Sequence, residues 1–462
     1  MALPTIRELL SSPAPVTGAV ARGWVKTRRD SKVMSFAELN DGSCRENLQV
    51  VFPPEGNFAE ILPSLVTGAA VEIRGDLISS PAAGQKYELR AGQIRIYGGC
   101  DPEKYPIQKK RASDEFLRTV AHLRPRTNKY AAMLRIRAEL AYAVHQYFHD
   151  KGFFYVHTPI ITASDGEGAG EMFTATTLDL ANPPRTDKGE IDFSKELLGK
   201  KTYLTVTGQL EGESLALALG KIYTFGPTFR AENSNTYRHA SEFWMIEPEM
   251  AFYELEDDME LAEDFIKSIT KRVLEKCPSD MELFAKFVEP ALMDNLRNIT
   301  ENKFERLTYT DAVKLLEPEN ARFETKVSWG VDLASEHERF LVEQHFKKPV
   351  ILYNKPKGAA AFYMKLNDDG RTVRGMDVLV PRIGEVIGGS ERENRLDVLE
   401  KKMADAGIDP AAYWWYLDLR RYGSVPHSGF GLGFERMMML VTGISNIRDV
   451  TAYPRVPGYA EF

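Results

Sequence analysis

Between residues 16 and 99, short apolar or alternating runs follow one another and are separated by turn-forming glycine and proline residues. Alternation with a period of two, bounded by such residues, predicts β-strands. The stretch FAEILPSLV, between the third and fourth runs, predicts a short helix. Five strands with a helix after the third favour an OB-fold barrel, a common oligonucleotide-binding module, although other small barrels share this strand count. The five runs are Val16–Val25, Met34–Asn40, Leu48–Phe52, Val71–Ile78 and Tyr87–Ile96.

The pattern changes to helical spacing after residue 128. Apolar residues recur along one face of a predicted helix over residues 128–151, and helical periodicity returns at Leu255–Lys276 and Arg395–Ala406. The β-rich runs between them lack the regular strand–helix alternation of a parallel sheet. We therefore predict an all-β domain over residues 1–100, a proline- and charge-rich linker over 101–128, and an α+β domain over 129–462 with a polar insertion loop near 182–200.

Composition indicates the cellular compartment of the protein and disfavours some kinds of cysteine-based site. The chain has 462 residues, a formal net charge of −7 and three cysteines, none of them in a CxxC pair. A disulfide framework or zinc site is therefore disfavoured, and a reducing compartment, the cytoplasm, is expected. The N-terminal residues lack the basic and apolar segments of a signal peptide, and no apolar run approaches the roughly 20 residues of a membrane helix.

Positive charge is concentrated in two segments despite the acidic total. Residues 104–137 contain ten lysines or arginines and two acids, and Arg22, Lys26, Arg28, Arg29 and Lys32 lie within the predicted barrel. One such cluster alone is most often a solvated face. Two clusters beside a small β-module favour a nucleic-acid surface.

The polar loop of a predicted hairpin carries the strongest chemical signal. The apolar runs IYTFGPTF and EFWMIEPEMAF flank NSNTYRHAS. Arg230 and Glu232 are two residues apart and should share a face at the end of the first strand. The loop adds Arg238 and His239, and the second strand adds Glu247. Composition alone leaves a hairpin held by structural salt bridges as an alternative.

Two later segments supply glycines, carboxylates and further arginines. HSGFGLGFERMMMLV predicts a glycine-lined strand, which lets a flat ligand approach, followed by a helix with Arg436 in its first turn; its spacing departs from the GxGxxG dinucleotide pattern. RGMDVLVPRIGEVIGGSER contains Asp377, Glu385 and Arg392. Hard oxygen ligands beside arginines are suited to Mg²⁺ bridging the phosphates of ATP.

Three segments, in order along the chain, resemble the signature motifs of one enzyme family. GFFYVHTPIIT, FRAENSNTYRHASEF and GFGLGFER are similar to motifs 1, 2 and 3 of the class II aminoacyl-tRNA synthetases, and the barrel with GWVKTRRD resembles the anticodon-binding domain of their aspartyl/asparaginyl/lysyl subgroup. The resemblance implies a central antiparallel catalytic sheet, ATP and Mg²⁺, a tRNA partner, no membrane association, and a homodimer whose interface includes motif 1 around Pro159.

The resemblance also implies residue roles. Arg230 would bridge the α-phosphate and the substrate carboxylate as a catalytic residue together with Arg436, and Glu232 would accept from the adenine amino group. Phe243 would stack on the adenine ring or be buried in the core. The resemblance implies that Arg238, His239 and Arg436 contact the outer phosphates and that Asp377 and Glu385 bind Mg²⁺. It implies that Glu167 and Gln209 contact the α-amino group, with Glu171 as a weaker candidate.

The identity of the amino acid rests on three positions. Arg392 lies seven residues after Glu385, where the resemblance implies an arginine that holds a side-chain oxygen, so lysine is disfavoured. Gly212 stands where aspartyl enzymes carry a lysine, and Glu247 where they carry an aspartate. The resulting pocket is more negative and would repel aspartate, whereas an asparagine amide can donate to Glu247 and accept from Arg392. Asparagine and tRNA(Asn) are therefore the expected substrates.

In the barrel, the resemblance implies that Phe36 stacks on the middle anticodon base, with Arg29 and Gln49 as polar neighbours. The alternative for Phe36 is a barrel-core phenylalanine. Three other functions stay open: an aspartyl-type or relaxed synthetase, an ammonia-using asparagine synthetase, and a non-catalytic RNA-binding paralogue.

Overall fold

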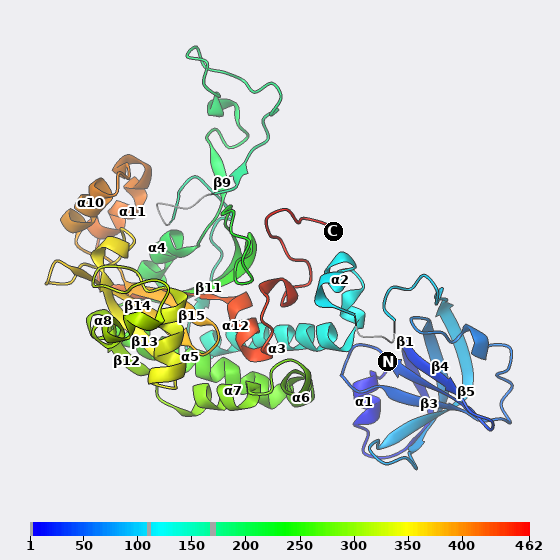
Figure 1. Cartoon of the computed structure of the whole chain (residues 1–462). Helices are drawn as coiled ribbons and strands as arrows, with labels where there is room; N and C mark the ends of the chain where they lie inside the picture. Colours follow the sequence, from blue (N-terminus) through cyan, green and yellow to red (C-terminus); the bar gives the residue numbers. More distant parts are fainter. Residues whose placement is uncertain (1–2, 109–111, 167–171) are drawn as a thin grey trace. The chain divides into compact units, whose positions relative to one another are not determined.

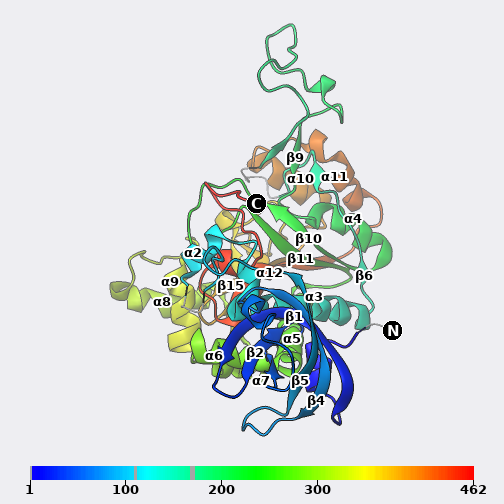
Figure 2. The same cartoon turned by 90° about the vertical axis from the view of Figure 1, so that its right-hand side faces the viewer.

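The computed structural model describes residues 3–108, 112–166 and 172–462. The chain divides into two compact units, Met1–Arg135 with Phe462, and Ile136–Glu461. The division falls within helix α3 (Asn128–Asp150), which matches the predicted helix (Figures 1 and 2). Within the part of the chain that the structure describes, no helix is long and apolar enough to cross a membrane.

The first unit is built on a closed barrel with strand order β1-β2-β3-β5-β4. All five predicted strands are present, and the pairing is antiparallel except between β3 and β5. Alternate side chains fill the interior with fully buried residues such as Ala21, Leu39, Val50, Ile73 and Leu89. The OB-fold prediction is thereby confirmed. The strands are β1 (Val16–Asp30), β2 (Ser35–Asn40), β3 (Leu48–Phe52), β4 (Ala70–Ser79) and β5 (Tyr87–Gly98).

Two details of this unit differ from the predictions. FAEILPSLV forms only a 3₁₀ turn at Leu62–Ser64, where Pro63 lacks the N–H that a longer helix requires. The predicted linker contains helix α2 (Asp114–Thr119), because the Ser113 hydroxyl accepts the backbone N–H of Phe116 and caps the first turn. A further capped helix, α1 (Ile6–Leu10), precedes the barrel.

The second unit is organised around an eight-stranded sheet of order β12-β13-β14-β15-β16-β11-β10-β6. Its pairs are antiparallel except β12–β13 and β10–β6, so the predicted antiparallel sheet is correct for its centre, and parallel pairs occur at both edges. The strands are β6 (Phe154–Tyr155), β10 (Lys221–Phe229), β11 (Glu242–Ala251), β12 (Glu305–Thr308), β13 (Val350–Pro356), β14 (Thr372–Val380), β15 (Gly384–Glu391) and β16 (His427–Gly433).

Helices cover the sheet and fix its central strands. The amphipathic helix α5 contacts β14, β15 and β16, and α4 contacts β10 and β11. Helices α10 and α11 lie side by side at one side of this unit, and α6 and α7 lie side by side at another (Figure 1). The helices are α4 (Gln209–Leu219), α5 (Leu255–Lys276), α6 (Pro278–Phe287), α7 (Leu292–Glu301), α8 (Tyr309–Leu316), α9 (Ser335–Arg339), α10 (Leu396–Asp405), α11 (Trp414–Arg421) and α12 (Phe434–Thr442).

The predicted insertion loop projects from a small sheet of order β7-β9-β8 (Figure 1). These strands are β7 (Ile161–Thr162), β8 (Thr174–Ala175) and β9 (Thr202–Leu204). The Glu196 carboxylate closes the loop by accepting from the hydroxyls of Thr176 and Thr177 and from the backbone N–H of Leu197, which lowers its pKa to about 2. A carboxylate so held is ionised at neutral pH and ties both ends of the insertion together.

Candidate active site

Strands β10 and β11 form the predicted hairpin and place Arg230 at its open end. The two strands pair from Lys221 with Met250 to Phe229 with Glu242. The prediction that the first strand itself carries Arg230 and Glu232 is wrong, because β10 ends at Phe229 and the chain opens into the loop. The Arg230 N–H still donates to the Ser241 carbonyl, at 3.0 Å, so the backbone of Arg230 remains fixed.

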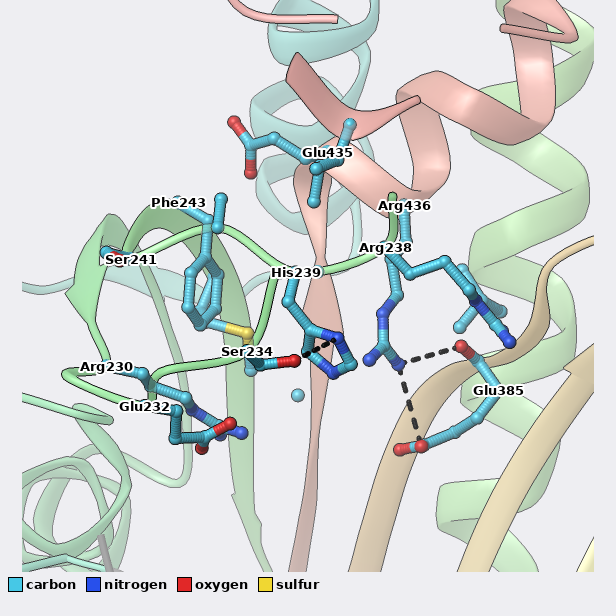
Figure 3. A pocket seen from close by; sticks show the side chains of 16 residues that line it. Arg230, Glu232, Ser234, Arg238, His239, Ser241, Phe243, Glu385, Glu435 and Arg436 are labelled. Atoms are coloured by element: carbon cyan, nitrogen blue, oxygen red, sulfur yellow. Dashed lines mark hydrogen bonds and ion pairs between the residues drawn. The ribbon is translucent and has the colours of Figure 1, made fainter. Parts of the chain in front are cut away.

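A first cavity opens between this loop, β15 and the start of α12 (Figure 3). It brings together all six residues predicted to bind ATP. Phe243 borders the cavity and is only partly buried, so the expectation of a core position does not apply to it. The predicted residues that line the cavity are Arg230, Glu232, Arg238, His239, Phe243, Glu385 and Arg436.

Three arginines, Arg230, Arg238 and Arg436, gather in this cavity beside the carboxylates of Glu232, Glu385 and Glu435. The pKa of His239 is lowered by burial and by repulsion from Arg436. Burial and Arg436 likewise lower the pKa of Arg238, whose guanidinium donates to the Ser335 hydroxyl at 3.0 Å. The His239 ring lies 2.6 Å from the Thr236 hydroxyl, measured at Nδ1. Positive groups held close together in a partly buried site favour a polyanionic ligand.

The two carboxylates predicted to bind Mg²⁺ lie on adjacent strands. A Cβ atom added to Gly388 would be 3.0 Å from Glu385 Oε1 and 3.7 Å from Asp377 Oδ1, so both side chains lie over this glycine. Lys355 pairs with Asp377 at 2.7 Å, and Arg436 with Glu385 at 3.5 Å. Among the described residues, no three acid, histidine or cysteine side chains are grouped to hold a metal. Two carboxylates therefore fit Mg²⁺ only when ligand oxygens complete its coordination.

Strand β16 and helix α12 confirm the predicted glycine-lined strand and helix. Gly431 and Gly433 line the first cavity. Gly429 has a different reason to be glycine, since a Cβ there would lie 2.4 Å from the Pro248 carbonyl oxygen. Glu435 is buried within the protein, where it pairs with Arg137 at 2.7 Å and accepts the Trp244 N–H at 2.9 Å.

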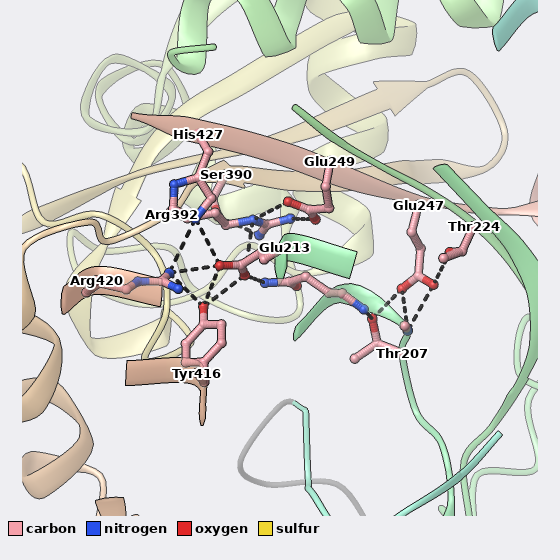
Figure 4. A network of polar contacts seen from close by, with 12 residues as sticks. Thr207, Glu213, Thr224, Glu247, Glu249, Ser390, Arg392, Tyr416, Arg420 and His427 are labelled. Carbon is pink, nitrogen blue, oxygen red and sulfur yellow. Dashed lines mark hydrogen bonds and ion pairs between the residues drawn. The ribbon is translucent and has the colours of Figure 1, made fainter. Parts of the chain in front are cut away.

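A second cavity of about 200 Å³ adjoins the first. It contains three of the side chains predicted to bind the amino acid: Gln209 for the α-amino group, and Glu247 and Arg392 for selection of the side chain. Glu247 accepts from the hydroxyls of Thr207 and Thr224, the latter at 3.0 Å, and from the Gly208 N–H at 3.0 Å (Figure 4). All of these donors are neutral, so they do not offset the negative charge that Glu247 brings to the cavity.

Arg392 is buried and held by a carboxylate that sequence reasoning missed. Its guanidinium pairs with Glu249 through two nitrogens, with Nε at 3.2 Å, and donates to the Ser390 hydroxyl at 2.9 Å. Glu249 is two residues after Glu247 on β11 and so lies on the same face of the strand. This spacing of two residues was the signal in the sequence that could have identified Glu249 as a site residue. Lys355 and Glu338 were also missed by sequence reasoning, since both come from segments far away along the chain. Burial raises the pKa of Glu338 to about 7, and repulsion from the carboxylates of Glu385 and Asp377 adds to this effect.

Gly212 lies in the first turns of α4 and faces the buried pair. A Cβ added there would be 3.7 Å from Glu249 Cγ and 3.5 Å from Ile222 Cδ1, which are ordinary contacts. The remaining predicted contacts to the α-amino group, Glu167 and Glu171, lie outside the described residues.

The three barrel residues predicted to contact an anticodon lie together. Arg29 and Phe36 are paired across β1 and β2, with the guanidinium 4.8 Å from the ring centroid. Arg29 also donates to Gln49 Oε1 at 3.2 Å. All three line a groove on the barrel, and Phe36 is partly exposed in it, so a core position for Phe36 is wrong.

Comparisons with known proteins agree along the whole chain. Residues 113–457 match the family described as tRNA synthetases class II (D, K and N), and residues 19–97 match the OB-fold nucleic acid binding domain. The chain is 57% identical over 458 residues to the asparagine–tRNA ligase of Nostoc sp. and 56% identical over 457 residues to that of Nitratidesulfovibrio vulgaris, with 99% of each chain covered. The asparaginyl-tRNA synthetase of Pyrococcus horikoshii, solved with asparaginyl-adenylate, superposes with a TM-score of 0.85 at 30% identity, covering 100% of this chain and 99% of the other.

Proposed function

Because the chain belongs to the class II tRNA synthetases of the D, K and N group, we propose that it joins asparagine to tRNA(Asn) in two ATP-dependent steps. Asparagine and ATP first form asparaginyl-adenylate and pyrophosphate. The 3′-terminal ribose of the tRNA then takes the asparaginyl group from the adenylate. The relatives that are asparagine–tRNA ligases, and the neighbour solved with asparaginyl-adenylate, support this choice of substrates.

One observation carries the proposal: Arg230 lines both cavities. The first cavity gathers three arginines, which suit the phosphates of a triphosphate, whereas the second contains Glu247 and Arg392 and suits a neutral amide side chain. The reaction joins a carboxylate oxygen to the α-phosphorus, and both reactants are anions. A planar guanidinium at the junction can donate to both at once, which orients them and offsets their repulsion.

The other side chains divide the ATP molecule among them. We assign Glu232 to the adenine amino group and Phe243 to the adenine ring, and we assign Arg238, His239 and Arg436 to the outer phosphates. Asp377 and Glu385 would hold Mg²⁺, which when bound neutralises phosphate charge. The role of Arg436 is supported by its bond to the Glu385 carbonyl, 3.0 Å long, because this bond keeps the guanidinium beside the proposed metal ligands.

Selection of asparagine follows from the charge of the second cavity. The Arg392 guanidinium can donate to the side-chain carbonyl oxygen of asparagine, and the amide nitrogen can donate to Glu247. Aspartate would instead place a carboxylate beside Glu247 in a buried site, where like charges repel by several kcal/mol. Pyrophosphate exchange measured separately with asparagine and with aspartate tests the assignment. Comparable rates with the two amino acids would contradict it.

We propose that the barrel groove binds the anticodon and that Phe36 stacks on a base. Phe36→Ala should raise the KM for tRNA by about 5- to 150-fold, since stacking on an aromatic ring contributes about 1–3 kcal/mol per base. Asparagine-dependent pyrophosphate exchange should not change. Tyr97→Ala is a matched control, because this ring is 50% exposed on the same barrel but does not line the groove. Equal effects of both variants on tRNA charging would argue against the groove.

We also propose a homodimer formed through the edge of the large sheet. Strand β6 is one of the two edge strands of this sheet, and four apolar side chains around Pro159 are exposed: Phe154, Tyr155, Ile160 and Ile161. Phe154→Asp should weaken the dimer by about 10²-fold or more, because a charge replaces a buried anchor. Light scattering coupled to size exclusion should then show the monomer mass. Phe287→Asp, at a phenylalanine 64% exposed at the end of α6, should stay dimeric.

The compartment we propose is the reducing cytoplasm, where the free cysteines Cys44, Cys100 and Cys277 are stable.

A further inference from the structure

Behind the second cavity, the Glu213 carboxylate is fully buried and receives donors from three elements (Figure 4). From α4, Gln209 Nε2 donates to it at 3.1 Å. From α11, the Tyr416 hydroxyl and Arg420 Nη2 each donate at 2.8 Å. From β16, His427 Nε2 lies 3.0 Å away. Four partners on two oxygens leave this carboxylate no freedom to turn.

The charges around Glu213 keep it ionised. Burial alone would raise its pKa, but Arg420 and His427 together with Arg392, whose Nε is 3.9 Å away, lower it overall. An ionised carboxylate can only accept hydrogen bonds. The Gln209 amide must therefore present its NH₂ group to Glu213, and its carbonyl oxygen is directed away from Glu213.

This orientation has a consequence for the amino-acid cavity, because Gln209 lines it. In the proposed function, Arg230 binds the substrate carboxylate in this cavity, while Glu247 and Arg392 bind the side-chain amide. The substrate group left is the α-ammonium, which can only donate. We propose that Glu213 is a positioning residue: it fixes the Gln209 amide so that the carbonyl oxygen accepts a hydrogen bond from the α-ammonium of the amino acid. This inference rests on the proposed function and extends it to a residue that does not line the cavity.

Glu213→Gln tests the orientation with almost no change of shape. The new amide can keep Arg420 and Tyr416 on its oxygen and turn its own NH₂ toward Gln209. Gln209 would then reverse and present its NH₂ to the ammonium. We expect the KM for asparagine to rise by about 10- to 100-fold, the loss of one hydrogen bond to a charged group, while the KM for ATP changes by about 2-fold at most.

An analogue without the amino group separates positioning from general damage. Succinamic acid is asparagine lacking the α-ammonium, so its inhibition constant should be the same in the wild type and in Glu213→Gln. The preference for asparagine over succinamic acid should fall by about 10-fold or more. Glu391→Gln is the matched control: Glu391 is also fully buried, and the donors to its carboxylate are Lys365, Arg374 and the Leu255 N–H rather than Gln209. It should lower thermal stability without raising the KM for asparagine.

The inference fails if Glu213→Gln leaves the KM for asparagine unchanged, or if succinamic acid and asparagine weaken equally. It also fails if Glu391→Gln has the same effect on KM. Should Glu213→Gln not fold, Tyr416→Phe removes a donor to both Glu213 oxygens; the partners of the Tyr416 hydroxyl are Glu213 and Arg420. This variant should raise the KM for asparagine by about 2- to 10-fold, the value of one ordinary hydrogen bond. An unchanged KM in this variant contradicts the proposal. Absence of asparagine-dependent exchange in the wild type would instead refute the proposed function.

Discussion

Arg230→Ala should reduce asparagine-dependent pyrophosphate exchange by on the order of 10³-fold, the scale of removing preorganised donors from a developing charge. The side chain lies where the two cavities meet, so its loss removes the contact to the α-phosphate and the contact to the substrate carboxylate together. The neighbouring cations Arg238 and Arg436 cannot substitute for it, because neither lines the second cavity.

The barrel provides the internal control for this variant. Binding of tRNA to Arg230→Ala should stay within about 3-fold of the wild type, because the substitution lies in the other compact unit and leaves the residues of the anticodon groove unchanged. Arg230→Lys keeps the charge but loses the planar fork, and it should fall between the wild type and the alanine variant. Exchange by Arg230→Ala within about 10-fold of the wild type would contradict the central assignment.

Glu247→Gln should collapse the preference for asparagine over aspartate. The carboxylate accepts from Thr207, Thr224 and Gly208, which leaves an acceptor position for the substrate amide. For asparagine, kcat/KM should fall by about 10- to 100-fold with the loss of a charged acceptor. For aspartate it should rise by on the order of 10²-fold, because a like charge no longer faces its carboxylate. Parallel exchange assays with the two amino acids measure both changes.

Thr224→Val is the matched control for Glu247→Gln. It removes a buried hydroxyl that donates to Glu247 at 3.0 Å but leaves the charge in place. Its effect should be about 10-fold at most and should apply to both amino acids alike. If Thr224→Val changed the preference as strongly as Glu247→Gln, hydrogen bonding rather than charge would control selectivity. A Glu247→Gln enzyme that still rejects aspartate would refute the assignment.

Much of the fold was predictable because its signals are local. Alternation located all five barrel strands, and the runs beside NSNTYRHAS located the hairpin β10–β11. The errors were local as well. Pro63 shortened the predicted helix to a 3₁₀ turn, and the Ser113 cap began a helix inside the predicted linker. In both places a single residue outweighed the composition of its segment.

The sequence by itself determined which residue types serve the chemistry, because the motifs that carry Arg230, Glu385 and Arg436 are short and their order along the chain is fixed. Only the tertiary structure decided how those residues are held. Glu249 forms an ion pair with Arg392, Lys355 forms one with Asp377, and Arg420 and His427 both contact Glu213. The partners in these pairs lie from 22 to more than 200 residues apart, and no periodicity in the sequence relates them. Burial gives the pairs their strength, since a charge removed from water must find its partner within the fold.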